Sequence, residues 1–116
     1  MKKIPLLIAG LLLVSISTMA QDKKPTAIPA DVEKLLTQYA CLACHKADAK
    51  VIGPAYAEVA KKKYTDAQIV ELIYTPKPAN WPGFPPMAPM KHVPKDDALK
   101  IAGWINSLAS SKKQKI

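Results

Sequence analysis

The sequence contains no arginine, although 17 lysines against 9 acidic residues give it a formal net charge of +8. Without the planar guanidinium group that commonly reads nucleic acids, this charge does not favour a nucleic-acid partner. Aromatic residues make up only 6% of the chain, and no segment alternates apolar and polar residues as a half-buried strand would. We also find no internal repeat. These absences argue against a sheet and against a repeat array.

No apolar run is long enough to span a bilayer, which takes about 20 residues. The longest, residues 4–16, contains thirteen residues and follows the positive pair Lys2 and Lys3. The residues that lead to Ala20 are small or are tolerated at the cleavage positions of a signal peptide. Residues 1–20 are therefore typical of a secretory signal peptide. We expect cleavage after Ala20, export to the periplasm and no stable membrane insertion afterwards. The alternative is an uncleaved anchor, for which the apolar run is short.

Removing residues 1–20 from the 116 leaves 96 residues, with 15 lysines, 9 acids and a net charge of +6. Residues 21–28 have no apolar period and predict a flexible lead-in. One domain is expected over residues 29–110, followed by a basic tail at 111–116. A domain this small is only marginally stable when its hydrophobic core is all that holds it together, and it gains stability from a covalent link.

The most informative segment is the C-x-x-C-H pattern formed by Cys41, Cys44 and His45. Two thiols at this spacing lie on adjacent faces of one helical turn, where both reach the edge of one porphyrin. The following imidazole then faces the metal. This pattern is the attachment signature of a covalently bound c-type haem. Thioether bonds to one haem c would also consume both thiols, as an exported protein requires.

Other uses of the two cysteines are a redox dithiol, a plain disulfide and half of a zinc site. A thioredoxin-like dithiol needs βαβ surroundings, which this sequence lacks. Zinc normally takes four nitrogen or sulfur ligands, and the chain offers only Cys41, Cys44, His45 and the remote His92. The C-x-x-C-H pattern therefore favours haem.

Apolar residues at helical spacing predict an all-α domain. A first helix opens near Pro29 and runs into the haem motif, and Pro54 is well placed as the first residue of a second helix, which extends to Lys63. Thr65 and Gln68 form a capping box that begins a third helix.

Seven of the eleven prolines lie within residues 76–94 and predict a stiff loop, because proline lacks an amide hydrogen. The last helix follows, with Asp96 and Asp97 at its positive end. Gly103 weakens that helix by roughly 1 kcal/mol relative to alanine, which a close helix crossing would explain.

Haem iron held by one histidine has a second axial position, and the group that fills it decides the function. Met87, Met90 and His92 carry suitable donors. Met87 stands between prolines that fix its backbone, and its thioether is a soft ligand. Met90 lies beside Lys91 in a more solvent-like setting. We favour Met87, and the alternatives are Met90, His92 and an open position.

The chain resembles the small bacterial class I cytochromes c of the c-551/c-552 type from Val32 to about Ala109. The motifs that carry the resemblance, in chain order, are the C-x-x-C-H segment, Gly53-Pro54-Ala55-Tyr56, Val59-Ala60, Trp81, Pro86-Met87-Ala88-Pro89, Val93, Asp96-Asp97-Ala98 and Trp104-Ile105.

The resemblance implies three or four helices wrapped around the haem, with the first and last crossing. The residues that it assigns to attachment and axial ligation are Cys41, Cys44, His45 and Met87. It also implies that the Pro54 carbonyl accepts a hydrogen bond from the ligand histidine, and that the Trp81 indole donates to a haem propionate.

Some positions depart from the family pattern. Met90 stands where an asparagine often bonds the ligand sulfur. Residues 75–80 replace a glycine-containing segment, and Lys77 or Asn80 would then support the second propionate. Pro94 stands where the last helix usually has a serine or threonine cap.

With both axial positions filled, substrates cannot reach the iron. The sequence therefore predicts a monomeric one-electron carrier of respiratory redox partners, not an enzyme. Lysines are expected around the exposed haem edge, where they steer acidic partners: Lys46, Lys50, Lys61, Lys62, Lys63 and Lys91. The alternatives are a haem enzyme or gas sensor with an open or labile sixth site, and a dedicated subunit of a dehydrogenase or reductase.

Overall fold

The computed structural model describes residue 10 and residues 27–111. The elements are α1 (Ala30–Gln38), the short 3-10 turn η1 (Cys41–Ala43), α2 (Tyr56–Lys61), α3 (Asp66–Tyr74), the 3-10 turn η2 (Pro78–Asn80) and α4 (Lys95–Ser111). In this part of the chain there is no strand, only an isolated bridge between His45 and Lys50. The all-α prediction is confirmed, whereas the proposed signal peptide, lead-in and tail lie almost entirely outside the described residues.

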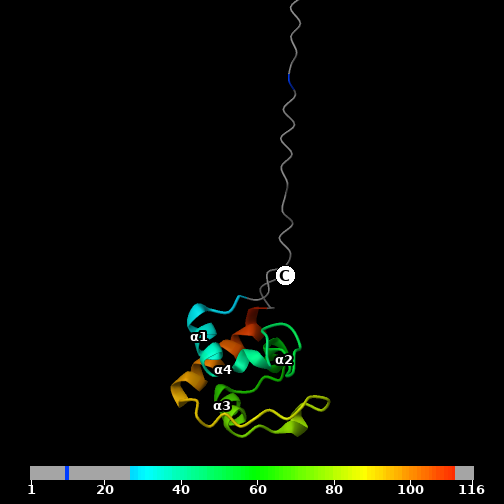
Figure 1. The fold of residues 1–116 in the computed structure, drawn as a ribbon, viewed down its shortest axis with the longest axis vertical. Coiled ribbons are helices and arrows are strands. Elements are labelled where there is room, and N and C mark those ends of the chain that lie inside the picture. Colours follow the sequence, from blue (N-terminus) through cyan, green and yellow to red (C-terminus); the bar gives the residue numbers. More distant parts are fainter. Residues whose placement is uncertain (1–9, 11–26, 112–116) are drawn as a thin grey trace, which may run out of the picture.

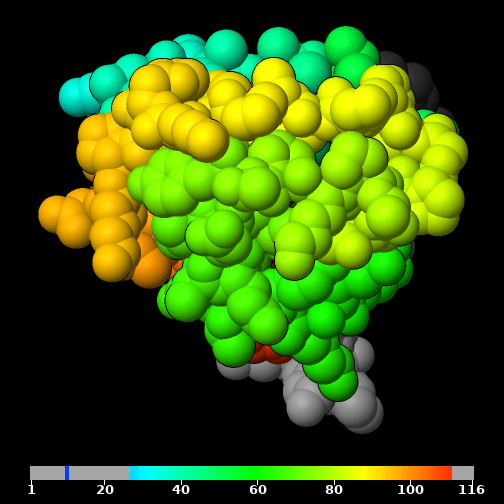
Figure 2. Space-filling model, turned by 90° about the horizontal axis from the view of Figure 1, so that it is seen from below, coloured from blue at the N-terminus to red at the C-terminus, as the bar shows by residue number. Residues whose placement is uncertain are grey.

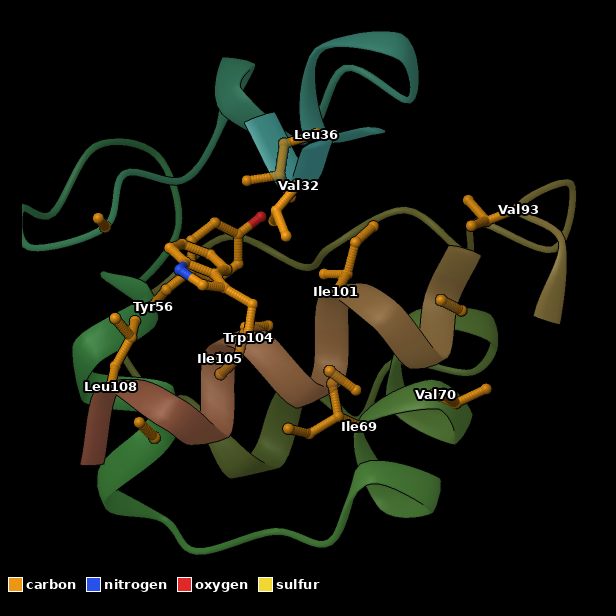
Figure 3. Packing of buried hydrophobic residues seen from close by; sticks show 14 residues of the cluster. Val32, Leu36, Tyr56, Ile69, Val70, Val93, Ile101, Trp104, Ile105 and Leu108 are labelled. Atoms are coloured by element: carbon orange, nitrogen blue, oxygen red, sulfur yellow. The ribbon is translucent and has the colours of Figure 1, made fainter. Parts of the chain in front are cut away.

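Helix α4 is the central element, and α1, α2 and α3 all pack against it (Figure 1). No helix among the described residues is long and apolar enough to cross a membrane. Figure 3 shows α4 between the side chains of α1 on one side and of α3 on the other. The first and last helices therefore meet, as expected.

The hydrophobic core follows the apolar face of α4. Leu36 of α1 is fully buried, and Trp104 of α4 meets the Tyr56 ring edge-on with the ring centroids 5.3 Å apart. Figure 3 shows these two rings lying together beside Val32 and Leu36. The Tyr56–Trp104 contact joins α2 to α4, and Tyr56 in turn lies next to the C-x-x-C-H segment through His45.

The end of α1 is tied to the start of α4. The Tyr39 hydroxyl donates a hydrogen bond of 2.6 Å to Asp97. Ala40, the residue after Tyr39, adopts a left-handed conformation with φ of 57°, which prevents α1 from continuing and turns the chain into η1. A non-glycine residue in this region is strained, at a cost on the order of 1 kcal/mol. The haem motif thus begins at a sharp turn rather than on a continuous helix.

Helix α3 begins as the sequence predicts. The Thr65 hydroxyl accepts a hydrogen bond from the Gln68 amide, and the Gln68 side chain accepts one from the Thr65 amide. The capping box is therefore complete. The helix ends at Tyr74.

Two local expectations are wrong. Pro54 does not begin the second helix, which starts at Tyr56, because the Pro54 carbonyl is committed to His45. Gly103 does not lie at a close helix crossing. A Cβ atom there would meet only the Asp66 carboxylate, at an ordinary contact distance of 3.8 Å.

The proline-rich segment 76–94 remains a loop apart from η2. Figure 2 shows it, coloured from yellow-green to gold, lying beside α3 across one face of the domain. Its end is fixed to α3, because the Met90 amide donates to the Ile73 carbonyl at 2.9 Å and the Tyr74 hydroxyl donates to the Val93 carbonyl at 2.8 Å.

Candidate haem-binding site

A cavity of about 360 Å³ opens between the C-x-x-C-H segment, α3, α4 and the proline-rich loop. This volume falls within the range of small-molecule and cofactor sites. The aliphatic residues that line it from the helices are Val59, Ile69, Leu72, Ile73, Ile101 and Ile105. The cavity is thus an extension of the hydrophobic core toward the surface.

The two cysteines lie at one side of this cavity. Cys41 and Cys44 are half-buried, are not bonded to each other, and both line it. Burial raises the pKa of the Cys41 thiol, and a hydrogen bond with the Tyr56 hydroxyl opposes that shift. Turn η1 therefore presents both sulfurs to one apolar space, as thioether attachment requires.

His45 lines the same cavity and is held in one tautomer. Its Nδ1 lies 2.7 Å from the Pro54 carbonyl oxygen. A carbonyl can only accept, so Nδ1 carries the proton and Nε2 keeps its lone pair for a metal. Burial lowers the pKa of the imidazole more than this hydrogen bond raises it, so the ring is neutral at neutral pH. The Tyr56 ring stacks on it, with centroids 4.8 Å apart.

Gly53 makes room for this histidine. A Cβ atom at Gly53 would lie 2.7 Å from His45 Cε1, 3.0 Å from His45 Nδ1 and 3.2 Å from the Cys44 carbonyl oxygen. From the sequence, Gly53 was expected only as a member of the Gly53-Pro54-Ala55-Tyr56 motif. The Gly53-Pro54 pair is the feature of the sequence that could have indicated this contact, because both residues lie close to the imidazole.

The three candidates for the second axial position are not equivalent. Met87 and Met90 both line the cavity, whereas His92 does not and instead lies beside the Tyr39 ring. Met87 is 40% exposed. Met90 is half-buried and packs against the core, so the expectation of a solvent-like setting for it is wrong.

Two lysines hold the proline-rich loop at its aromatic residues. The Lys62 ammonium lies 4.7 Å from the centroid of the Trp81 ring, and the Lys50 ammonium lies 4.7 Å from that of Phe84. The two rings meet edge-on, with centroids 6.0 Å apart, and both line the cavity. This lysine clasp, defined as Lys50, Lys62, Trp81 and Phe84, was not predicted.

The residues present fit a haem. Two unbridged thiols, a neutral imidazole with a free Nε2 and a thioether donor surround one apolar cavity. By contrast, no group of three His, Cys, Asp or Glu side chains within residues 27–111 is arranged to hold a metal ion alone. The fold and the site together define a small helical domain for a covalently attached c-type haem.

The family is shown by comparison with known proteins. The family model described as Cytochrome c matches residues 29–109, so the chain belongs to the cytochrome c family. It is 38% identical to the cytochrome c-551 of Allochromatium vinosum, over 59% of this chain and 76% of that protein. It is 39% identical to the cytochrome c-552 of Hydrogenobacter thermophilus, over 66% and 80%.

The structure leads to the same family. It is similar to the crystal structure of Nitrosomonas europaea cytochrome c552, with a TM-score of 0.60 and 31% identity, covering 66% of this chain and 98% of that one. The class I fold of the c-551/c-552 type is therefore confirmed. With Cys41 and Cys44 in the C-x-x-C-H pattern, family membership assigns one covalently bound haem c and a role in electron transfer with redox partners.

Proposed function

We propose that this protein is a periplasmic one-electron carrier whose haem is held between His45 and Met87. The observation that carries the proposal is the 2.7 Å contact of His45 Nδ1 with the Pro54 carbonyl, because it leaves the Nε2 lone pair free to bind a metal. Met87 lines the same cavity and supplies a neutral thioether. A His/Met pair favours ferrous iron and raises the reduction potential.

The bound haem supplies reversible one-electron chemistry, and each residue of the site has a defined task. Cys41 and Cys44 hold the cofactor covalently, and Pro54 orients the imidazole of His45. The apolar lining from α3 and α4 excludes water. With His45 and Met87 both holding the metal, a substrate would find no free position on it. These features support a carrier rather than an enzyme.

Trp81 is proposed to donate its indole N–H to a haem propionate. The side chain is half-buried and lines the cavity, and within the described residues its indole N–H has no hydrogen-bond partner. Lys62 over the ring face adds a positive charge nearby. A donor without a partner, next to a cation, suits a carboxylate. Lys77 and Asn80 also line the cavity and remain our candidates for the second propionate.

Electron exchange is proposed to occur with an acidic partner that docks near the C-x-x-C-H segment. Lys46 directly follows that segment and is exposed. Lys46→Glu should slow association with an acidic partner several-fold at low salt and little at high salt, where charges are screened. Lys34→Glu on α1, outside the cavity lining, changes the net charge equally and is the control. Equal effects of both variants would contradict local steering.

Export is proposed to proceed by cleavage after Ala20 and to yield a monomer without a membrane anchor. The intact mass of protein from the periplasmic fraction tests both the cut and the cofactor. We expect a chain beginning at Gln21 with the mass of one haem added. A mass equal to that of the bare polypeptide would refute haem attachment, and a retained residue 1–20 segment would refute the cut.

The spectrum of the purified haem-loaded protein tests the carrier function. We expect a low-spin ferric state and a ferrous state that resists carbon monoxide, since both axial positions are filled. Proton NMR of the ferrous form should show a methionine methyl group shifted strongly by the ring current of the haem. A high-spin protein that binds carbon monoxide readily would indicate the gas sensor or enzyme instead.

A further inference from the structure

Two methionines, rather than one, line the haem cavity. Met87 and Met90 lie three positions apart in the sequence, on either side of Pro89, and both contact the same space as His45. Both side chains end in the same soft sulfur donor. Methionine is unbranched and has three rotatable side-chain bonds, so its sulfur can shift without a large backbone change.

The two residues are anchored very differently. Among the described residues, no hydrogen bond holds the backbone of residues 85–89, which carries Met87. Met90, by contrast, donates its amide to the Ile73 carbonyl at 2.9 Å and accepts from the Val93 amide at 3.2 Å. The more exposed methionine thus lies on the less anchored segment, and the less exposed one is fixed to α3.

Other donors are less well placed to replace Met87. His92 does not line the cavity, and its ring lies 6.0 Å from the ring of Tyr39. Lys77 does line the cavity, but its side chain is exposed and its ammonium would have to lose a proton before it could bind a metal. Met90 needs no proton transfer, because a thioether is neutral at every pH.

We propose that Met90 is a reserve axial ligand, meaning that its sulfur takes the position of the Met87 sulfur when the latter is lost. This inference rests on the proposed His45/Met87 ligation. The exchange breaks one metal–sulfur bond and forms another, and it transfers no electron or proton. It matters when hydrogen peroxide transfers one oxygen atom to the exposed Met87 thioether, giving the sulfoxide and water, because Met90 is less exposed to such an oxidant.

The experiment uses the haem-loaded protein with 13C-labelled methionine methyl groups. Its variants are Met87→Ala, Met90→Leu and the double variant. Leucine keeps the volume of Met90 in the core but removes the sulfur, so the double variant should fold like the single one. In the wild type and in Met90→Leu, the ferrous spectrum should show one strongly shifted methyl group, that of Met87.

In Met87→Ala, the Met90 methyl group should become strongly shifted, and this signal should vanish in the double variant. The double variant should also bind carbon monoxide at least about tenfold more tightly than Met87→Ala, because a sulfur that occupies the site nine-tenths of the time lowers the apparent affinity by that factor. Both readouts compare two proteins that differ only at residue 90.

The reserve role is overturned if Met87→Ala shows no shifted methyl group and binds carbon monoxide as the double variant does, since water or Lys77 then fills the site. A different result bears on the proposed function. If Met90→Leu, and not Met87→Ala, removes the shifted methyl group of the wild type, Met90 is the resident ligand. The assignment of Met87 then fails, and the reserve role fails with it.

Discussion

Replacing Gly53 by alanine tests how closely the chain confines its metal-binding histidine. The new Cβ atom would lie 2.7 Å from His45 Cε1 and 3.0 Å from His45 Nδ1, both closer than ordinary van der Waals contact. It would also lie 3.2 Å from the Cys44 carbonyl oxygen, which belongs to the backbone and cannot rotate away. The imidazole must therefore move, and its 2.7 Å hydrogen bond to Pro54 must lengthen or break.

The expected loss of stability has two parts. Overpacking a filled site costs about 1–3 kcal/mol, and losing one hydrogen bond costs about 0.5–1.5 kcal/mol. We therefore expect Gly53→Ala to lower the free energy of unfolding by about 1.5–4.5 kcal/mol. The reduction potential should rise, because a histidine without its carbonyl partner is a less basic ligand and stabilises ferric iron less.

Denaturant unfolding and potentiometry of the haem-loaded protein measure these two effects. Gly103→Ala is the matched control. Residue 103 lies inside helix α4, and the nearest atom to a new Cβ there would be 3.8 Å away. That variant should be more stable than the wild type by up to about 1 kcal/mol, with an unchanged potential. If Gly53→Ala unfolds at the wild-type midpoint with the wild-type potential, the backbone does not confine His45 and the reasoning is wrong.

Three further predictions address the cap, the α1–α4 contact and the loop. Thr65→Ala removes the side-chain cap of α3 and should lower the free energy of unfolding by about 1 kcal/mol in a denaturant titration. Tyr39→Phe should abolish the loss of stability that the wild type shows when the pH becomes alkaline. The hydrogen bond to Asp97 raises the pKa of Tyr39 above its ordinary value of 10.0. The stability that this hydrogen bond contributes is therefore fully present below pH 10.0, and it is lost as the pH rises through the folded-state pKa. Lys50→Gln removes the cation over Phe84 and should speed the binding of added imidazole to the haem by about two- to fivefold, which stopped-flow absorbance measures.

Each of these predictions has a control. Thr65→Ser keeps the hydroxyl and should resemble the wild type; a Thr65→Ala protein of wild-type stability would show that the cap contributes nothing. For Tyr39, parallel alkaline declines of the wild type and the phenylalanine variant would contradict the shifted pKa. For Lys50, the control is Lys46→Gln, which loses the same charge without an aromatic contact. Equal acceleration in both lysine variants would assign the effect to net charge.

The helices were predictable because their signals are local. Apolar residues spaced along each helix and the Thr65–Gln68 capping box depend on neighbours within a few positions. The C-x-x-C-H segment is equally local, and it identified the cofactor. Where a residue's environment depends on a distant segment, the same reasoning failed.

Pro54 and Met90 illustrate that failure. A proline after glycine fits the first turn of a helix, but a tertiary hydrogen bond to His45 commits its carbonyl and delays the helix to Tyr56. Met90 stands beside a lysine, yet the hydrogen bond that its amide donates to the Ile73 carbonyl holds it against the core. Neither partner is visible in a local pattern. The pairing of Lys50 with Phe84 was missed for the same reason.

The half-buried residues of the cavity indicate what a cofactor would add to the core. Among the described residues, Leu36 is the only large side chain below 2% exposure, and Ile69, Ile101 and Ile105 follow at 3–4%. The aliphatic residues that line the cavity and are only half-buried lie on faces of α2 and α3: Val59, Leu72 and Ile73. An apolar cofactor in that space would bury those faces, and its thioethers would tie it to the turn that follows α1. Haem attachment would therefore extend the hydrophobic core, and Tyr56 would serve both, because its ring stacks on His45 and meets Trp104 of α4 edge-on.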